Sequence, residues 1–259
     1  MQHARVEERV ASRRAPLFAV PRISAALLAF TLLATAVAFL GSPSAALAAT
    51  PQPLPLQMAQ TLGAQQMVIA TGSRLGSTTG TLRVFNLVDG SWVETLSVPA
   101  RFGKKGLIDG ARRKEGSKTT PTGIWRMPNW VFGTGSSAPI GTAMGYRRIT
   151  SRSWWSRKPG RTYNTWVEAR SWPGERLATA RSAYEFAVST GYNQRPNRCV
   201  YGRGTAIFLH VRGSGLTAGC IAISRADMIR VCRLLDPASR PVFAVGTLQR
   251  GRSTSIWAY

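Results

Sequence analysis

Residues 206–210 read AIFLH and residues 217–223 read TAGCIAI, and these two stretches decide the fold. Each contains a short, fully apolar run that is typical of a buried β-strand. The first run ends at His210, and the second begins directly after Cys220. Gly219 lets the backbone turn tightly in front of the thiol. We therefore expect the intervening loop to fold back and bring the histidine close to the cysteine.

These two residues suit nucleophilic catalysis. A thiol is mostly protonated at neutral pH, so it needs a base within hydrogen-bond reach. The only other histidine is His3, in a segment expected to lie outside the folded domain, so His210 is the available base. Backbone N–H groups around Gly219 are placed to face a developing oxyanion. The alternative is a buried structural cysteine beside an unrelated core histidine.

Composition narrows the function classes. The chain is 44% hydrophobic and 17% charged, which is typical of a globular protein. Its formal charge of +23 attracts polyanions, such as nucleic acid, anionic lipid or anionic cell-wall polymers. No nucleic-acid-binding motif occurs, so no nucleic-acid partner is expected. Outside residues 1–48 there are one histidine and nine acidic residues, with no metal-ligand cluster, paired carboxylates or cofactor loop. We expect neither metal nor cofactor.

The chain divides into four parts. Residues 1–48 combine a basic start, an uncharged apolar run at 23–40 and an Ala-Leu-Ala site at 46–48, typical of a cleaved signal peptide. The alternative is an uncleaved membrane anchor. Residues 49–64 are rich in Pro and Gln and are interpreted as a linker, residues 65–247 as the catalytic domain, and residues 248–259 as a C-terminal tail. Either N-terminal reading predicts an exported domain outside the cytoplasmic membrane; a location at the cell wall, rather than only at the outer face of the membrane, depends on the family resemblance described below.

The domain is predicted to be mainly β with one short helix. Strands are expected at residues 66–70, 82–87, 91–96, 184–188 and 241–245, and Asp89-Gly90 predicts a hairpin turn. After the cysteine, Ser224 can cap a helix whose apolar face carries Met228, Val231, Cys232 and Leu235, and Pro237 ends it.

Three stretches resemble the YkuD-type L,D-transpeptidases, cysteine enzymes that cross-link or modify bacterial peptidoglycan. Residues 113–123 (RKEGSKTTPTG) resemble the family's KxEGD-K-TPxG segment, residues 206–210 its histidine strand and residues 217–222 its S/T-x-G-C-I/V signature. The resemblance covers roughly residues 65–246. It implies a YkuD-like β-sandwich or barrel, with a thioester formed between Cys220 and a stem peptide.

The resemblance also assigns roles around the nucleophile. His210 acts as general base and then as general acid, oriented by a carbonyl or hydroxyl of the 211–214 loop, for which Ser214 is the candidate. Gly219 and Thr217 belong to the oxyanion and orienting group. Ala218 stands where the better-studied branch has a second histidine, which places the chain in a divergent TAGC branch.

Other residues are assigned with their alternatives. Arg113 can bind a substrate carboxylate, or lie on a solvated face. Tyr192 and Asn193 can touch substrate, or simply end a strand. In an exported protein Cys199 and Cys232 can form a disulfide, or remain two buried thiols.

Three functions follow. The first is an L,D-transpeptidase acting on peptidoglycan stem peptides, with anionic wall polymers as further partners and membrane contact only through an uncleaved N-terminus. The second is an L,D-carboxypeptidase or amidase that uses the same site. The third is a catalytically silent wall-binding module.

Overall fold

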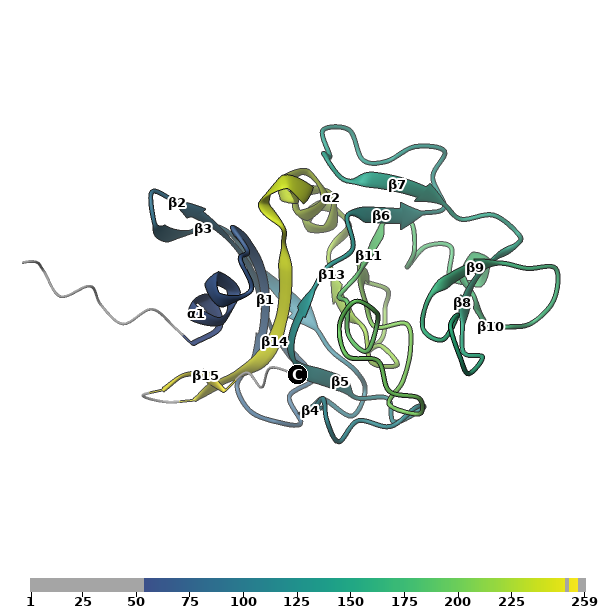
Figure 1. Ribbon diagram of the computed structural model, residues 1–259, viewed down its shortest axis with the longest axis horizontal. Coiled ribbons are helices and arrows are strands. Elements are labelled where there is room, and N and C mark those ends of the chain that lie inside the picture. The colour runs from purple at the N-terminus through teal and green to yellow at the C-terminus, as the bar shows by residue number, and fades with distance from the viewer. Residues whose placement is uncertain (1–53, 250–251, 256–259) are drawn as a thin grey trace, which may run out of the picture. The chain divides into compact units, whose positions relative to one another are not determined.

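The computed structural model describes residues 54–249 and 252–255, and these form a mainly β unit (Figure 1). The expected signal peptide or anchor, residues 1–48, lies outside the described residues. No described helix has the length and apolarity to cross a membrane.

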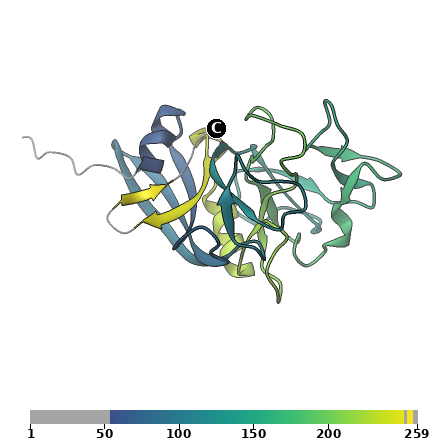
Figure 2. The same cartoon turned by 90° about the horizontal axis from the view of Figure 1, so that it is seen from below.

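Twelve strands form one sheet in the order β4-β5-β14-β1-β2-β3-β13-β12-β11-β6-β7, with β15 paired to β14. A second, three-stranded sheet has the order β10-β8-β9. The strands are β1 (Gln66–Gly72), β2 (Thr79–Val88), β3 (Ser91–Arg101), β4 (Leu107–Asp109), β5 (Thr120–Arg126), β6 (Trp130–Gly133), β7 (Gly145–Arg148), β8 (Ser153–Ser156), β9 (Trp166–Glu168), β10 (Gly174–Arg176), β11 (Ala187–Ser189), β12 (Phe208–Val211), β13 (Ile221–Ile223), β14 (Val242–Gln249) and β15 (Arg252–Ser255). Figures 1 and 2 both place the small sheet at the far end of the unit from β2 and β3.

The hairpin and the helix predicted from the sequence are confirmed. β2 and β3 join through Asp89 and Gly90, which both have positive φ, as a two-residue type I′ turn requires. Helix α2 (Arg225–Leu234) begins at Ser224, whose side chain accepts a hydrogen bond from the Asp227 N–H at 3.1 Å. Its buried face packs into the main core.

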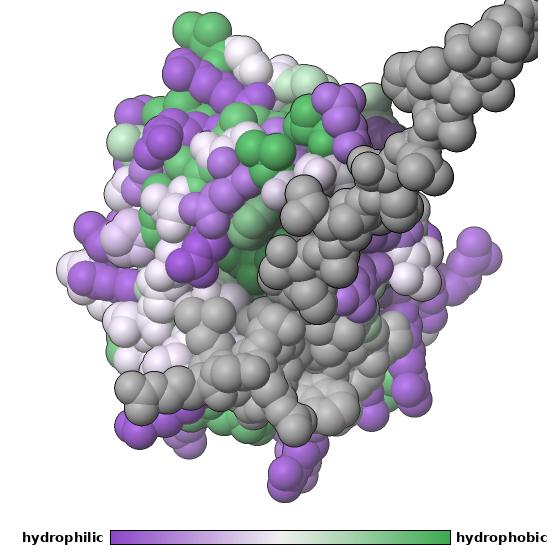
Figure 3. Space-filling model, turned by 90° about the vertical axis from the view of Figure 1, so that its left-hand side faces the viewer, coloured by the Kyte–Doolittle hydropathy of each residue, from purple (hydrophilic) through white to green (hydrophobic). Residues whose placement is uncertain are grey.

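Two segments differ from the sequence analysis. Where a linker is expected, helix α1 (Leu54–Thr61) forms, because Leu56 and Ala59 bury themselves against Met67 of β1. Where a tail is expected, β14 continues to Gln249 and β15 turns back to pair with it. Figure 3 looks onto the side that carries α1, β2 and β3, where hydrophilic and hydrophobic residues are interspersed.

Successive side chains of the central strands point to opposite faces of the sheet and so pack into different hydrophobic clusters. Leu209 of β12 and Ile221 of β13 face the main core. Phe208 points the other way, into a second cluster built around Phe132 and Trp155, whose rings pack at 5.0 and 4.7 Å from that of Phe208. Two short 3₁₀ helices, η1 (Leu177–Thr179) and η2 (Pro237–Ser239), complete the described fold. The second cluster forms the floor beneath the candidate site.

Candidate active site

Parallel pairing of β12 and β13 sets the positions of the histidine and the cysteine. Leu209 lies opposite Ile221 and His210 lies opposite Ala222. In the same register, Cys220 falls opposite Phe208, one residue before β13. Side chains two residues apart share a face of a sheet, about 6.6 Å apart along the strand. The thiol and the imidazole therefore project from one face of neighbouring strands, as the sequence predicts.

The turn before the cysteine leaves no room for a side chain. Gly219 has φ of +139°, and a Cβ there would lie 2.8 Å from the Thr119 carbonyl oxygen and 3.0 Å from Nη2 of Arg113. Thr217 closes the turn: its hydroxyl accepts from the Gly219 N–H at 3.1 Å and donates to the Cys220 carbonyl at 2.6 Å. Thr217 thus orients the backbone of the nucleophile, and the Gly219 N–H is already engaged.

The thiol is held by the backbone in front of β12. Cys220 Sγ donates to the Ala206 carbonyl at 3.2 Å and accepts from the Phe208 N–H at 3.4 Å. Burial raises the pKa of the Cys220 thiol to about 12, and Glu175 also raises it, whereas the Phe208 N–H and Arg113 act in the opposite direction. The resting thiol is therefore protonated, with its proton directed at a carbonyl rather than at the imidazole.

A strained residue presents that carbonyl. Ala206 has φ of +57°, which is uncommon for a residue with a side chain. Its N–H donates at 3.0 Å to Oδ1 of Asn164, a buried residue whose Nδ2 also holds the carbonyl of Tyr192 at 3.0 Å. Strain of this kind persists where the surroundings fix the backbone, and it is frequent at functional sites.

His210 is oriented by a main-chain carbonyl. Its Nδ1 lies 2.8 Å from the Val211 oxygen. Because a carbonyl only accepts, Nδ1 carries the proton of the neutral ring and Nε2 is left as the basic nitrogen. Burial lowers the pKa of His210, and the Val211 hydrogen bond opposes that shift. The orienting group is thus a carbonyl of the 211–214 loop, as expected, but that of Val211 rather than a group of Ser214, whose carbonyl accepts from Arg101 at 2.9 Å.

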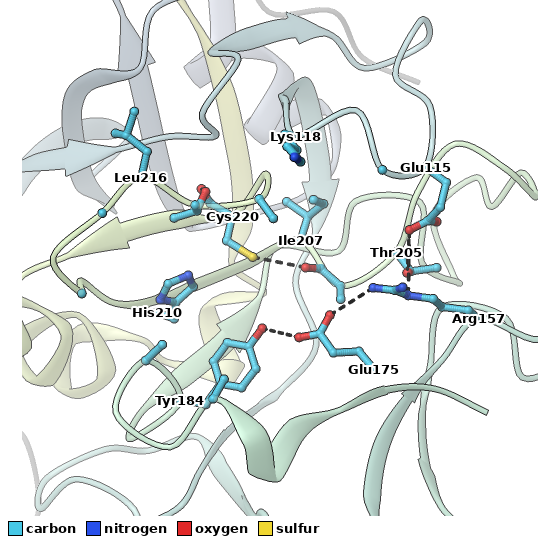
Figure 4. A pocket seen from close by; sticks show the side chains of 18 of the residues that line it. Glu115, Lys118, Arg157, Glu175, Tyr184, Thr205, Ile207, His210, Leu216 and Cys220 are labelled. Atoms are coloured by element: carbon cyan, nitrogen blue, oxygen red, sulfur yellow. Dashed lines mark hydrogen bonds and ion pairs between the residues drawn. The ribbon is translucent and has the colours of Figure 1, made fainter. Parts of the chain in front are cut away.

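Both residues line one cavity of about 510 Å³. Figure 4 shows His210 and Leu216 on one side of Cys220, and charged residues on the other. The lining residues are Arg113, Glu115, Gly116, Lys118, Arg157, Glu175, Ala180, Ala183, Tyr184, Thr205, Ala206, Ile207, His210, Gly213, Ser214, Gly215, Leu216, Thr217, Ala218 and Cys220. Cys220 thus lies between the imidazole and the charged part of the lining.

The charged side is a chain of hydrogen bonds and ion pairs that the sequence analysis missed. The Tyr184 hydroxyl donates to Glu175 at 2.6 Å, and Glu175 pairs with Arg157 at 3.5 Å. Arg157 also lies 3.9 Å from Glu115. The Tyr184 ring packs edge-on against His210, with centroids 5.6 Å apart. Burial raises the pKa of Glu175, and Tyr184 and Arg157 lower it. Of these residues, only Glu115 lies in a stretch, residues 113–123, that the sequence marks by its resemblance to a family segment.

Arg113 lines the cavity, but its guanidinium is committed to the protein. It is 4% exposed, which excludes the solvated alternative. Its Nε donates to the Thr119 carbonyl and its Nη1 to the Arg203 carbonyl, both at 2.9 Å. Arg113 therefore links the backbone at Thr119 to the backbone at Arg203, next to Gly219.

Tyr192 and Asn193, expected as substrate contacts, are buried away from the cavity. The Tyr192 hydroxyl shares its single proton between the carbonyls of Gly110 and Arg203, which lie 3.1 and 3.0 Å away. Asn193 Nδ2 holds the Gly204 carbonyl at 2.8 Å, and its Oδ1 accepts from the Val200 N–H at 2.6 Å. Both residues hold the loop that leads into β12, and these contacts favour the structural alternative over substrate contact.

The expected disulfide is absent, because Cys199 and Cys232 are both free. Cys232 is fully buried on α2 in the main core, while Cys199 is half-buried in the loop before β12. Among the described residues, no group of three or more His, Cys, Asp and Glu is placed to hold a metal ion.

The geometry suits acyl transfer through a thioester: a nucleophilic sulfur, an imidazole with a free Nε2, and a cavity that opens onto both. A comparison with curated proteins gives no match. Residues 64–243 match a family model described as the YkuD L,D-transpeptidase catalytic domain. The match spans well over half of the chain and includes the whole candidate site. The chain therefore belongs to the YkuD family of L,D-transpeptidase catalytic domains.

Proposed function

We propose that this protein is an exported, peptidoglycan-modifying cysteine acyltransferase, an L,D-transpeptidase with Cys220 as nucleophile and His210 as general base and acid. One observation carries the proposal: the Cys220 thiol and the His210 imidazole line the same cavity from adjacent parallel strands. The family match supports the reaction class.

In the acylation step, Cys220 Sγ attacks an amide carbonyl of a stem peptide. The thiol turns from the Ala206 carbonyl, and its proton passes to Nε2 of His210, since Nδ1 is occupied by Val211. The Gly219 N–H is held by Thr217, so the Cys220 N–H is the donor of this turn that stabilises the oxyanion. When the tetrahedral intermediate collapses, the C–N bond breaks, and His210 returns the proton to the leaving amine.

In the second step, the thioester is resolved. The amine of a second stem peptide attacks it in transpeptidation, and His210 accepts the amine proton as the C–S bond breaks. Water takes the same role in carboxypeptidation. A catalytically silent wall-binding module is the second candidate, favoured by the burial that keeps the resting thiol protonated.

The proposal places the domain outside the cytoplasmic membrane, at the cell wall. Residues 1–48 act as a cleaved signal or as an anchor, which is then the part in contact with the membrane. The chain's charge of +23 supports attraction to anionic wall polymers.

Intact-mass spectrometry after incubation with a carbapenem or a stem tetrapeptide tests the proposal. The wild type is expected to form an adduct, and Cys220→Ala is expected to form none. His210→Ala should form the adduct at a rate reduced by about 100-fold or more. Cys199→Ala is the matched control and retains the adduct. Absence of an adduct with every acyl donor would establish the silent module. Analysis of products from purified muropeptides then separates cross-linked dimers from hydrolysed stems.

A further inference from the structure

A second cavity of about 640 Å³ lies on the other side of one wall of the candidate active site. It is formed where β6 and β7 end and where the chain passes from β10 through η1 toward β11. Its lining residues are Thr134, Arg148, Ile149, Thr150, Ser151, Arg176, Ala178, Thr179 and Arg181. None of them has a role in the catalytic proposal.

The lining of this cavity is positively charged. Three of its residues are arginines, and no lining residue is acidic. None of these arginines belongs to the ion pairs found among the described residues. The carboxylate of Glu168, which Thr150 reaches at 3.3 Å, is engaged by the Ser153 hydroxyl and the Trp166 indole at 2.9 and 2.7 Å. Glu168 thus supplies one carboxylate beside the lining residue Thr150, and the three exposed arginines leave the cavity with a net positive charge.

The arginines come from backbone that is held in place. Arg176 pairs with Trp154 across the small sheet, and its carbonyl accepts from Thr179 at 2.7 Å. The Arg181 carbonyl accepts from the Thr134 hydroxyl at 3.2 Å. Arg148 ends β7 in register with Gly133. Because the backbone is fixed before a ligand arrives, less conformational entropy is lost on binding.

The two cavities share the segment 175–184. Glu175 and Tyr184 face the candidate active site, whereas Arg176, Thr179 and Arg181 face the second cavity. A polymer held on the arginine side would therefore keep the catalytic cavity beside the material to which that polymer is attached, which raises the effective substrate concentration.

We propose that the second cavity binds phosphate groups of a polyol polymer linked by phosphodiesters. Arginine forks match phosphate oxygens, and the hydroxyl of Ser151 can pair with those of a polyol. Single-stranded nucleic acid is disfavoured, because no lining residue is aromatic and such ligands need stacking surfaces. The choice of occupant rests on the proposed location at the cell wall, but the binding test does not depend on catalysis at Cys220, so either can fail without the other.

Calorimetric titration of the full chain tests it, with a synthetic oligo(glycerol phosphate) as the probe at about 150 mM salt. The double variant Arg176→Ala/Arg181→Ala is expected to raise the Kd by about 10-fold or more, since charge-assisted hydrogen bonds are lost. The matched control, Arg74→Ala/Arg161→Ala, removes the same charge at exposed sites elsewhere and is expected to change Kd by less than about 3-fold.

Three further probes separate the alternatives. Inorganic phosphate should bind more weakly than the oligomer but with the same dependence on Arg176 and Arg181, because the cavity holds individual phosphate groups. An equal loss in both double variants would show attraction by net charge and would refute the site. Equal affinity for poly-glutamate, or for a single-stranded oligonucleotide of the same charge, would refute the phosphodiester–polyol assignment. Circular dichroism melting of each variant controls for folding, and Arg176→Gln/Arg181→Gln replaces any variant that melts early.

Discussion

Exchange of Cys220 with a small neutral disulfide, such as 2-hydroxyethyl disulfide, measures how much of the thiol is ionised in the resting protein. With a pKa of about 12 instead of the ordinary 9.0, the thiolate fraction at neutral to mildly alkaline pH is about 1000-fold lower. A more basic thiolate is intrinsically more nucleophilic, by about 15–30-fold for this difference. The net rate should therefore be about 30–60-fold below that of an unperturbed cysteine.

The assay follows Cys220 modification by mass spectrometry in a Cys199→Ser background, with the same chain unfolded in urea as the reference. The rate should rise about tenfold per pH unit from pH 7 to pH 10 without reaching a plateau, because the pKa lies above that range. Restricted access alone would slow the reaction but leave a plateau above about pH 9. A plateau below pH 8 would reveal a resting thiolate–imidazolium pair, and a rate equal to that of the unfolded reference would reveal an unperturbed thiol; either result would refute the reasoning.

Replacing the imidazole separates resting ionisation from catalysis. His210→Ala should change the disulfide exchange rate by less than about 3-fold, because Sγ is bonded to backbone groups and not to the imidazole. The same variant should slow carbapenem acylation by about 100-fold or more. Acylation by the wild type should fall as pH drops below the His210 pKa, which burial places under the usual 6.5, since only the neutral ring accepts a proton. Equal effects of His210→Ala on both reactions would contradict the resting geometry.

Three further substitutions test neighbouring parts of the site. Glu175→Gln removes a charge that raises the pKa of Cys220, so disulfide exchange should quicken by about 3-fold or more; a slower rate would contradict this electrostatic role. Gly219→Ala places a Cβ against the Thr119 carbonyl at positive φ. It should lower the free energy of unfolding, measured in urea, by about 1–3 kcal/mol and slow acylation. An unchanged midpoint of urea unfolding would show that the turn relaxes. Asn193→Ala leaves buried backbone groups unpaired and should cost about 2–4 kcal/mol, while the folded fraction acylates at the wild-type rate; a specific loss of acylation would restore the substrate-contact assignment.

Local sequence was sufficient for the central strands. A short apolar run must be buried, and alternation along it fixes which side chains share a face. That reasoning places His210 and Cys220 near each other, and the structure has them on one face of β12 and β13. The capped helix and the two-residue hairpin depend on neighbours a few residues apart, so they too were predictable.

What could not be predicted depends on distant contacts. The segment 49–64 has a weak local preference, and α1 forms because the surface of β1 is there to cover. Tyr192 and Asn193 carry the polar groups of a binding residue, but these groups bind backbone instead. Tyr192 reaches the carbonyl of Gly110, 82 residues away, and Asn193 reaches backbone groups of Val200 and Gly204, 7 and 11 residues away. The link between Glu175 and Tyr184 joins β10 to the turn before β11, and no fixed spacing marks it.

The hydrogen bond from Cys220 to the Ala206 carbonyl also has a consequence for oxidation. Peroxide converts thiolates, far more readily than thiols, to sulfenic acid and then to irreversible higher oxides. A sulfur whose proton rests on a main-chain oxygen is a poor target for that chemistry. The resting protein is therefore expected to keep Cys220 reduced under oxidising conditions, and in the proposed mechanism the sulfur becomes vulnerable only during the interval in which its proton has passed to His210.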